Sequence, residues 1–285
     1  MRPSRLIALT LFGLAVKTEG RFGERIIAEM LPPELRKKLA EGVSDGQMEV
    51  PDGDKGLAGE REDLLSRGKF LARFEHLSRY SGTARKAHGT VLDIGCGTGY
   101  GAAILSTKAN VVALDISPAA LRFARKSYPG PEFVMATATS IPLADESVDM
   151  VTAFEIIEHL AEPDKFLAEC HRTLKKGGVL VLSSPNPAHL INWLKNKLLG
   201  IPIPPKMVAE NIYHVREFTH DEMVGLLSSK GFRLVHDAKG QTIDLPYIRG
   251  PFRFLGIGEV YDVLFSRLGN EFPRISYTVV YVASK

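Results

Sequence analysis

Two carboxylates and a histidine lie close together near the middle of the chain. Glu155, Glu158 and His159 are spaced so that all three would share one face of a helix. An imidazole is easily poised near neutral pH, where it can take a proton from a hydroxyl group. With His214 downstream, the set offers two carboxylates and two imidazoles, which can together hold one Mg²⁺, Mn²⁺ or Zn²⁺. The sequence therefore predicts a general base or a divalent cation site at this cluster.

A glycine-rich turn precedes the cluster. Residues 90–94 form an apolar run that predicts a buried parallel strand, and Gly95, Gly97 and Gly99 follow it. The small residues of 100–107 then predict a helix. Strand, glycine turn and helix form the first crossover of an α/β nucleotide-binding sheet, because glycine lets a ligand lie against the backbone. The turn therefore predicts a nucleotide-type ligand at the end of this strand.

An acid ends the next apolar run. Residues 110–114 predict a second buried strand, and Asp115 stands about twenty residues beyond the glycine turn. A carboxylate in this place can accept hydrogen bonds from both hydroxyls of a ribose. Ser117 and Pro118 then provide a sound helix start. Asp115 is therefore the expected ribose ligand, whichever nucleoside-containing cofactor binds.

The glycine pattern leaves two kinds of cofactor open. In the frame that starts at Gly95, the dinucleotide fingerprint fails because Tyr100 occupies the third glycine position. In the frame that starts at Gly97, the looser form ending in alanine fits at Gly97, Gly99 and Ala102. A nicotinamide-dependent dehydrogenase is therefore an alternative, and motifs elsewhere in the chain have to distinguish between the two cofactors.

Several spaced motifs resemble one family. Residues 93–99, Asp-Ile-Gly-Cys-Gly-Thr-Gly, resemble the first motif of class I S-adenosylmethionine (SAM)-dependent methyltransferases of the ubiquinone- and menaquinone-type group. Asp149 ahead of a fourth strand and Glu-x-x-Glu-His-Leu at 155–160 resemble the same family and have no reason to occur in a dehydrogenase. Ser-Pro-Asn-Pro at 184–187 closes a resemblance that covers residues 61–187. It implies methyl transfer from SAM to a small molecule, most readily at oxygen, with a non-catalytic SAM-binding protein as a further alternative.

The resemblance also implies roles for individual residues. Cofactor contacts are expected from Asp93, Gly95, Cys96, Gly97, Gly99, Asp115, Ile116, Thr137, Ala138, Thr139, Phe154 and Glu155. Many family members carry aspartate where Thr137 stands, although a hydroxyl can still accept a hydrogen bond from the adenine amino group. His159, with Glu158 beside it, is the expected catalytic base.

The cluster at 155–159 with His214 further resembles two groups of methyltransferases that bind metal with such residues. These are the ubiquinone-pathway O-methyltransferases and the small-RNA 3′-end methyltransferases. A bound ion would lower the pKa of the acceptor hydroxyl directly. The same motif is found in relatives without metal, so a base and an ion both remain open.

A helix is predicted over residues 61–81, ahead of the first strand. Its end, residues 74–80, resembles a segment found before the glycine motif in bacterial methyltransferases of cell-surface saccharide clusters. Two interpretations stay open for this end. Either Arg79 or Tyr80 reaches the SAM carboxylate, or both side chains are ordinary exposed polar groups.

The chain is predicted to form an α/β fold with a doubly wound, mostly parallel, seven-stranded Rossmann-like sheet. The strands are expected at 90–94, 110–114, 133–135, 147–154, 179–183, 231–235 and 276–283. Residues 1–60 form a helical extension and linker, and residues 61–285 the methyltransferase domain. Insertions at about 188–215 and 241–274 would hang over the carboxyl ends of the strands as a substrate lid, or serve as packing or an oligomer contact.

Composition narrows the partners and the compartment. A net charge of +3 without a concentrated basic face argues against nucleic acid as a partner. Two cysteines are too few for a disulfide framework, which indicates a reducing, cytoplasmic setting. The apolar run 6–16 behind a basic start is interpreted as a packed helix, with a membrane-surface anchor or a secretion signal as alternatives. Saccharide, lipid and quinone-like acceptors remain open, and the apolar insertions favour a lipophilic or membrane-proximal one.

Overall fold

The computed structural model describes residues 70–203, 214–236, 238–241 and 258–285, with isolated residues between 29 and 36. The predicted extension at 1–60 therefore lies almost entirely outside the described residues, as do parts of both predicted insertions. Within the described part of the chain, no helix is long and apolar enough to cross a membrane.

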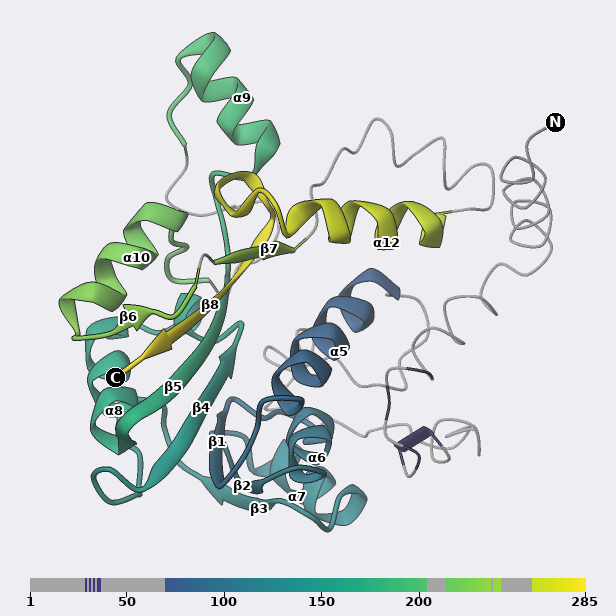
Figure 1. Ribbon diagram of the computed structural model, residues 1–285, viewed down its shortest axis with the longest axis vertical. Coiled ribbons are helices and arrows are strands. Elements are labelled where there is room, and N and C mark those ends of the chain that lie inside the picture. Colours follow the sequence, from purple (N-terminus) through teal and green to yellow (C-terminus); the bar gives the residue numbers. More distant parts are fainter. Residues whose placement is uncertain are drawn as a thin grey trace, which may run out of the picture.

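The core is one sheet in the order β3-β2-β1-β4-β5-β8-β6 (Figure 1). Its strands are β1 (Thr90–Ile94), β2 (Asn110–Asp115), β3 (Glu132–Met135), β4 (Val148–Phe154), β5 (Leu174–Pro185), β6 (Arg233–Leu234), β7 (Lys239–Gln241) and β8 (Thr278–Ser284). Strands β1 to β5 pair in parallel, whereas β8 runs antiparallel between β5 and β6. The predicted doubly wound, mostly parallel sheet is confirmed.

The edge of the sheet beyond β8 is made of two short strands. β6 pairs with residues 283–284 of β8, and β7 pairs with residues 278–280. Together they occupy one position in the sheet, which therefore keeps seven positions. The sequence predicts the first of these strands at 231–235 but not β7, because its Lys-Gly-Gln sequence has little β-propensity.

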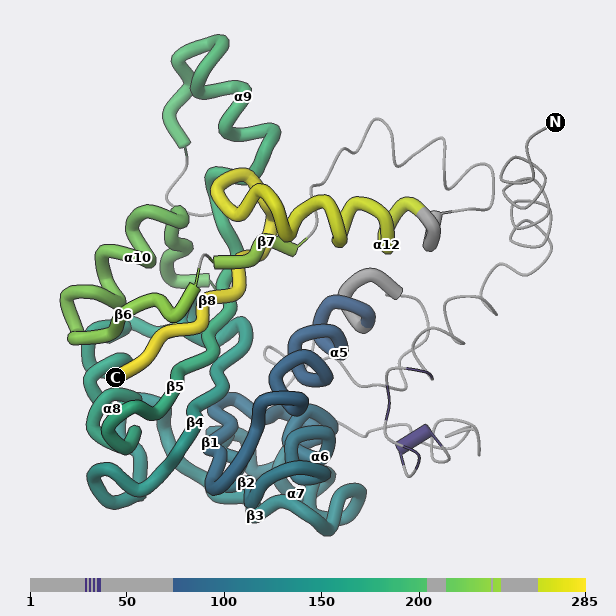
Figure 2. Tube along the Cα trace, viewed as in Figure 1, coloured from purple at the N-terminus to yellow at the C-terminus, as the bar shows by residue number. Residues whose placement is uncertain are grey.

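Helices cover both faces of the sheet. One hydrophobic cluster packs α5 (Phe70–Ala84), α6 (Tyr100–Ser106) and α7 (Pro118–Ser127) against one face, and a second packs α8 (Pro163–Thr173) and α10 (His220–Ser229) against the other. The helices α9 (Leu190–Leu199) and α12 (Gly258–Gly269) come from the two predicted insertions. Figure 2 shows both at the end of the molecule where β5 leads into α9.

The strand order predicts where a ligand should bind, namely at the carboxyl ends of β1 to β4, a place called the crevice below. From β1 the chain runs outward to β2 and β3, and then returns to β4 on the other side of β1. Ligands bind in open α/β sheets at this reversal, outside the carboxyl ends of the strands. The residues that follow β1, β2, β3 and β4 therefore lie at the same end of the sheet, and they include the glycine turn and the segment 155–159.

Candidate active site

The glycine turn after β1 borders open space at one residue. Gly95, Gly97 and Gly99 all have positive φ angles, at 73°, 50° and 87°. A Cβ on Gly95 would collide with the side chain of Ile156, whereas a Cβ on Gly97 would meet nothing within 4 Å. Gly95 is thus required by packing within the protein, and Gly97 is where a ligand can approach the backbone.

Asp115 lies beside this opening with its carboxylate held by the backbone. Its Oδ2 accepts a hydrogen bond from Gly97 N at 2.9 Å, and its Oδ1 accepts one from Ser117 N at 2.8 Å. The residue is only 7% exposed. Each carboxylate oxygen can accept a further hydrogen bond, so Asp115 is oriented to receive a pair of hydroxyls.

Exposed apolar side chains flank Asp115. Ile116 directly follows it and is 56% exposed, and Met135 at the end of β3 is 62% exposed. Met135 lies opposite Asp115 in the β2–β3 pairing. Ala138 is buried nearby in the chain, and the hydroxyls of Thr137 and Thr139 lie 3.3 Å apart. Apolar side chains and hydroxyl groups thus lie where they can enclose a planar base, and Met135 is a candidate contact that the sequence does not indicate.

Cys96 and Phe154, two expected cofactor contacts, belong to the core beneath the site. Cys96 is 5% and Phe154 4% exposed, and both belong to the hydrophobic cluster that α5 and α6 share. The Phe154 ring packs edge-on against Tyr80, with 4.8 Å between ring centroids. Both residues support the floor of the crevice through packing.

Asp93 is fully buried at the end of β1. Its carboxylate accepts hydrogen bonds from Thr152 Oγ1 at 2.7 Å and from the Tyr80 hydroxyl at 3.3 Å. Burial, together with the nearby Asp115 carboxylate, raises the pKa of Asp93 to about 7, although the two hydrogen bonds act to lower it. We therefore expect Asp93 to make the stability of the folded protein depend on pH near neutrality.

Replacing Asp93 with asparagine should remove this dependence on pH. Because its folded-state pKa lies above the ordinary 3.8, the stabilisation is complete below that ordinary value and is lost as the pH rises through about 7. Between about pH 5 and about pH 8, this group alone should lower the free energy of unfolding by roughly 2–3 kcal/mol. Urea unfolding of Asp93→Asn and the parent protein at both pH values measures the difference. An equal decline in the two proteins would contradict the assignment.

Arg79 is buried, which rules out the interpretation of this residue as an ordinary exposed polar group. Its Nη1 donates to Glu155 Oε1 at 3.1 Å and to Gln241 Oε1 at 2.8 Å. Ser183 Oγ donates to the same Glu155 oxygen at 2.8 Å. Tyr80 instead directs its hydroxyl to Asp93. Arg79 therefore joins α5, β7 and the end of β4 at the mouth of the crevice.

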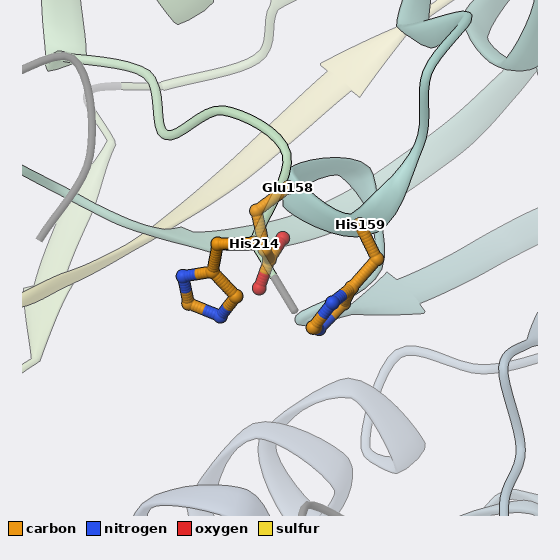
Figure 3. Close-up of side chains that lie close together, drawn as sticks. All are labelled: Glu158, His159 and His214. Atoms are coloured by element: carbon orange, nitrogen blue, oxygen red, sulfur yellow. The ribbon is translucent and has the colours of Figure 1, made fainter. Parts of the chain in front are cut away.

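Glu158, His159 and His214 come together beyond the end of β4 (Figure 3). One ligand atom from each lies within 4.8 Å of the others. Glu158 is fully buried, and neither of its carboxylate oxygens has a hydrogen-bond partner among the described residues. Burial raises the pKa of Glu158 well above its ordinary value, and the carboxylates of Glu155 and Glu217 add to this effect. A cation or a proton at this point would offset the cost of burying the charge.

The loop that carries His214 is fixed against this cluster. His214 Nδ1 lies 2.6 Å from Glu217 Oε1, and Glu217 is 1% exposed. The backbone N–H groups of Val215 and Arg216 both donate to the Glu158 carbonyl, at 2.8 and 3.2 Å. The rings of His159 and His214 are in edge contact, 4.9 Å between centroids. With Nδ1 engaged by Glu217, His214 can present its Nε2 to a ligand.

Glu155 does not join this group, although the sequence analysis placed it there on the premise of a helix. β4 ends at Phe154, Glu155 has a φ of 56°, and only residues 157–159 form a 3-10 turn, η2. The unusual backbone directs its carboxylate to Arg79 and Ser183. Three of the four candidate metal ligands therefore converge, and the fourth lies in the neighbouring ion pair.

Comparison with known proteins identifies the class. A family model described as a methyltransferase domain matches residues 92–182. A probable SAM-dependent methyltransferase of Mycolicibacterium smegmatis is 34% identical over 188 residues, which are 65% of this chain and 67% of that protein. The chain belongs to the SAM-dependent methyltransferases, as its motifs predict, and SAM is the methyl donor of this family. The nicotinamide alternative for the glycine turn has no support from these relatives.

Other relatives match a smaller part of this chain. A probable SAM-dependent methyltransferase of Mycobacterium tuberculosis is 36% identical over 143 residues, 50% of this chain and 48% of that protein, so the match spans about half of each. A ubiquinone biosynthesis O-methyltransferase of Dinoroseobacter shibae is 32% identical over 160 residues, 54% of this chain and 63% of that protein. A SAM-dependent methyltransferase of Archaeoglobus fulgidus shares the fold, with a TM-score of 0.51 and 20% identity over 80% of this chain and 99% of that chain.

Proposed function

We propose that this protein transfers a methyl group from SAM to a hydroxyl oxygen of a small, lipophilic acceptor, such as a lipid or a quinone-like molecule. The observation that carries the proposal is the cluster of Glu158, His159 and His214 beside the crevice. Carbon or sulfur acceptors with low pKa values have less need of such a group, whereas an alcohol must lose its proton during transfer. The O-methyltransferase among the relatives supports oxygen as the acceptor atom.

The residues at the crevice fit SAM. Gly97 faces open space, Asp115 can receive the two ribose hydroxyls, and Ile116 and Met135 can enclose the adenine. Arg79 is suited to the cofactor carboxylate, because its Nε has no hydrogen-bond partner among the described residues. When bound, SAM supplies an electrophilic methyl group on a sulfonium that is its own leaving group.

The residues of this chain have two roles in the proposed reaction: they position the acceptor, and they remove its proton. We assign the general base to His159, which follows β4 and lies beside the crevice. Glu158 lies next to His159 as a buried carboxyl group, and the His214 ring is in edge contact with the His159 ring. In-line approach and exclusion of water should contribute most of the remaining rate enhancement.

A divalent cation is a second candidate for the same task. Glu158 is a buried carboxylate without a hydrogen-bond partner in the described part of the chain, and two imidazoles lie within reach of it. Glu217 supports His214 as carboxylates commonly support metal-bound histidines. Glu158, His159 and His214 would hold the ion, which would lower the pKa of an acceptor hydroxyl.

The insertions favour a lipophilic acceptor that is reached near a membrane. Large apolar side chains of α12 and of the segment after it remain exposed, among them Leu264 at 57%, Leu268 at 44% and Phe272 at 48%. Contiguous exposed apolar surface commonly marks a binding face. We place the protein in the cytoplasm, since Cys96 and Cys170 are buried and neither forms a disulfide.

Calorimetric titration and a product assay test the proposal in sequence. S-adenosylhomocysteine should bind in the micromolar range, and NAD should not bind. The protein should then convert SAM to S-adenosylhomocysteine when a hydroxylated lipid or quinol is added. The same acceptor with its hydroxyl already methylated should not support this conversion. Cofactor binding without transfer to any lipid, quinol or saccharide would instead indicate a non-catalytic SAM-binding protein.

A further inference from the structure

Helix α9 exposes an unusual amount of apolar surface. None of its side chains is buried, and Figure 1 shows it standing away from the sheet and from the other helices. Trp193 is 37% exposed, Leu198 76% and Leu199 70%, and Ile201 just beyond the helix is 47% exposed. Water-facing side chains of this size, gathered on one short helix, are typical of a surface that meets a partner.

The helix combines an apolar strip with positive charge. Leu190, Leu194 and Leu198 recur at every fourth position and so lie along one side of the helix. The exposed residues Lys195 and Lys197 fall on opposite flanks of this strip. No aspartate or glutamate stands between residues 170 and 209 to neutralise them. Apolar residues with tryptophan, flanked by lysines, are the pattern of helices that lie in a membrane interface.

The helix is connected to the crevice by short, fixed segments. Ser183 of β5 hydrogen-bonds to Glu155 at the crevice, and β5 ends only two residues later. Asn186, just before α9, donates to the carbonyls of Arg274 and Ser276 at 3.1 and 3.0 Å. The segment that contains Arg274 and Ser276 also carries the exposed Phe272. A surface on which α9 docked would therefore lie close to the entrance of the crevice.

We propose that α9 docks on the surface of an anionic lipid bilayer, with its leucine strip and Trp193 inserted and its lysines against the lipid headgroups. A second copy of the chain would suit this surface less well. In a self-complementary contact, the lysines of both copies would come together without acids to pair with them. An anionic bilayer satisfies both the charge and the apolar strip. The docking extends the proposal of a membrane-proximal acceptor, but it does not depend on methyl transfer.

Trp193 makes the docking directly measurable, because it is the only tryptophan in the chain. Its emission reports on α9 alone. On addition of phosphatidylglycerol vesicles to the full-length protein, the emission should shift to shorter wavelength and become protected from acrylamide quenching. Phosphatidylcholine vesicles should have much less effect, and added salt should reverse the shift. Vesicle flotation then measures the bound fraction.

Two variants separate the apolar from the electrostatic contribution. Leu198→Glu should weaken vesicle binding at least about tenfold, because it places a charge in the inserted strip. Lys195→Glu with Lys197→Glu should abolish the preference for anionic lipid. Val235→Glu is the matched control, since Val235 is also exposed, at 54%, but follows β6 at the sheet edge. All variants should bind S-adenosylhomocysteine as the parent protein does, which shows that they are folded.

Three results would overturn the docking. The first is an unchanged Trp193 emission together with no flotation on anionic vesicles. The second is equal binding to both lipids that the lysine variant leaves intact. The third is a blue-shifted emission that depends on protein concentration in the absence of vesicles, accompanied by a dimer mass, which would assign the surface to a second copy. Methyl transfer that fails while vesicle binding persists would count against the proposed function and not against the docking.

Discussion

Replacing Asp115 with alanine should weaken the binding of S-adenosylhomocysteine at least ~100-fold. The backbone N–H groups of Gly97 and Ser117 hold the carboxylate, so it is already oriented before the ligand arrives. A hydrogen bond to a charged group contributes about 1.5–3 kcal/mol, and two of them account for a loss of this size. Isothermal titration calorimetry at constant pH and salt measures the two dissociation constants.

The control for this variant is Glu132→Gln. Glu132 is an exposed carboxylate that begins β3 at the opposite end of the sheet, so its removal should leave affinity unchanged. Alanine at position 115 also removes the two backbone contacts, and the thermal midpoint of each variant must therefore be measured alongside. If Asp115→Ala bound with near-parental affinity while remaining folded, the ribose would have to bind elsewhere.

The parts of the site that the sequence predicts are those built from neighbours in the chain. An apolar run, an acid and alternate glycines specify a strand and the turn that follows it, and local sterics leave such a segment few other structures. Asp115 is predictable for the same reason, since its two backbone partners lie in the turn and the helix start that the same motifs define. Adjacent parallel strands then bring these segments to one edge.

The parts that the sequence does not predict depend on contacts between distant segments. Arg79 meets Gln241 although they are 162 positions apart, and nothing in the short β7 strand indicates such a partner. Met135 lies beside Asp115 only because β2 and β3 pair in this register. The spacing of Glu155 from Glu158 indicates one helix face, but the positive φ of Glu155 breaks that geometry. A pattern of residue types carries no signal for such a backbone angle.

The pair of His214 and Glu217 could be predicted from the sequence only in part. The three-residue spacing is visible in the sequence, and a search for a carboxylate near each candidate histidine would have found Glu217. That the pair meets Glu158 depends on the backbone N–H groups of Val215 and Arg216, which bind the Glu158 carbonyl. The cluster is therefore a product of tertiary structure, and its chemistry has to be tested on the folded protein.

Replacing His159 with alanine should lower kcat by about 10²- to 10⁴-fold, the usual contribution of a general base, and leave the binding of S-adenosylhomocysteine unchanged. The glycine turn follows β1 and Asp115 ends β2, whereas His159 follows β4, so the affinity for the cofactor has no reason to fall. His88→Ala is the matched control, because His88 is exposed and precedes β1 at the far end of the sheet. Single-turnover kinetics with the acceptor identified in the product assay measures the effect. Parental turnover by His159→Ala would remove this residue from the mechanism.

Glu158→Gln and a chelator then distinguish the base from the cation. If an ion is held, the purified protein should contain about one equivalent of it, EDTA should abolish turnover, and Glu158→Gln and His214→Ala should lose both metal and activity. If His159 acts as a base alone, EDTA should have no effect and elemental analysis should find no stoichiometric metal. Glutamine is nearly isosteric with glutamate and relieves the cost of a buried charge, so Glu158→Gln should fold at least as stably as the parent. Its loss of activity would therefore reflect chemistry at the cluster.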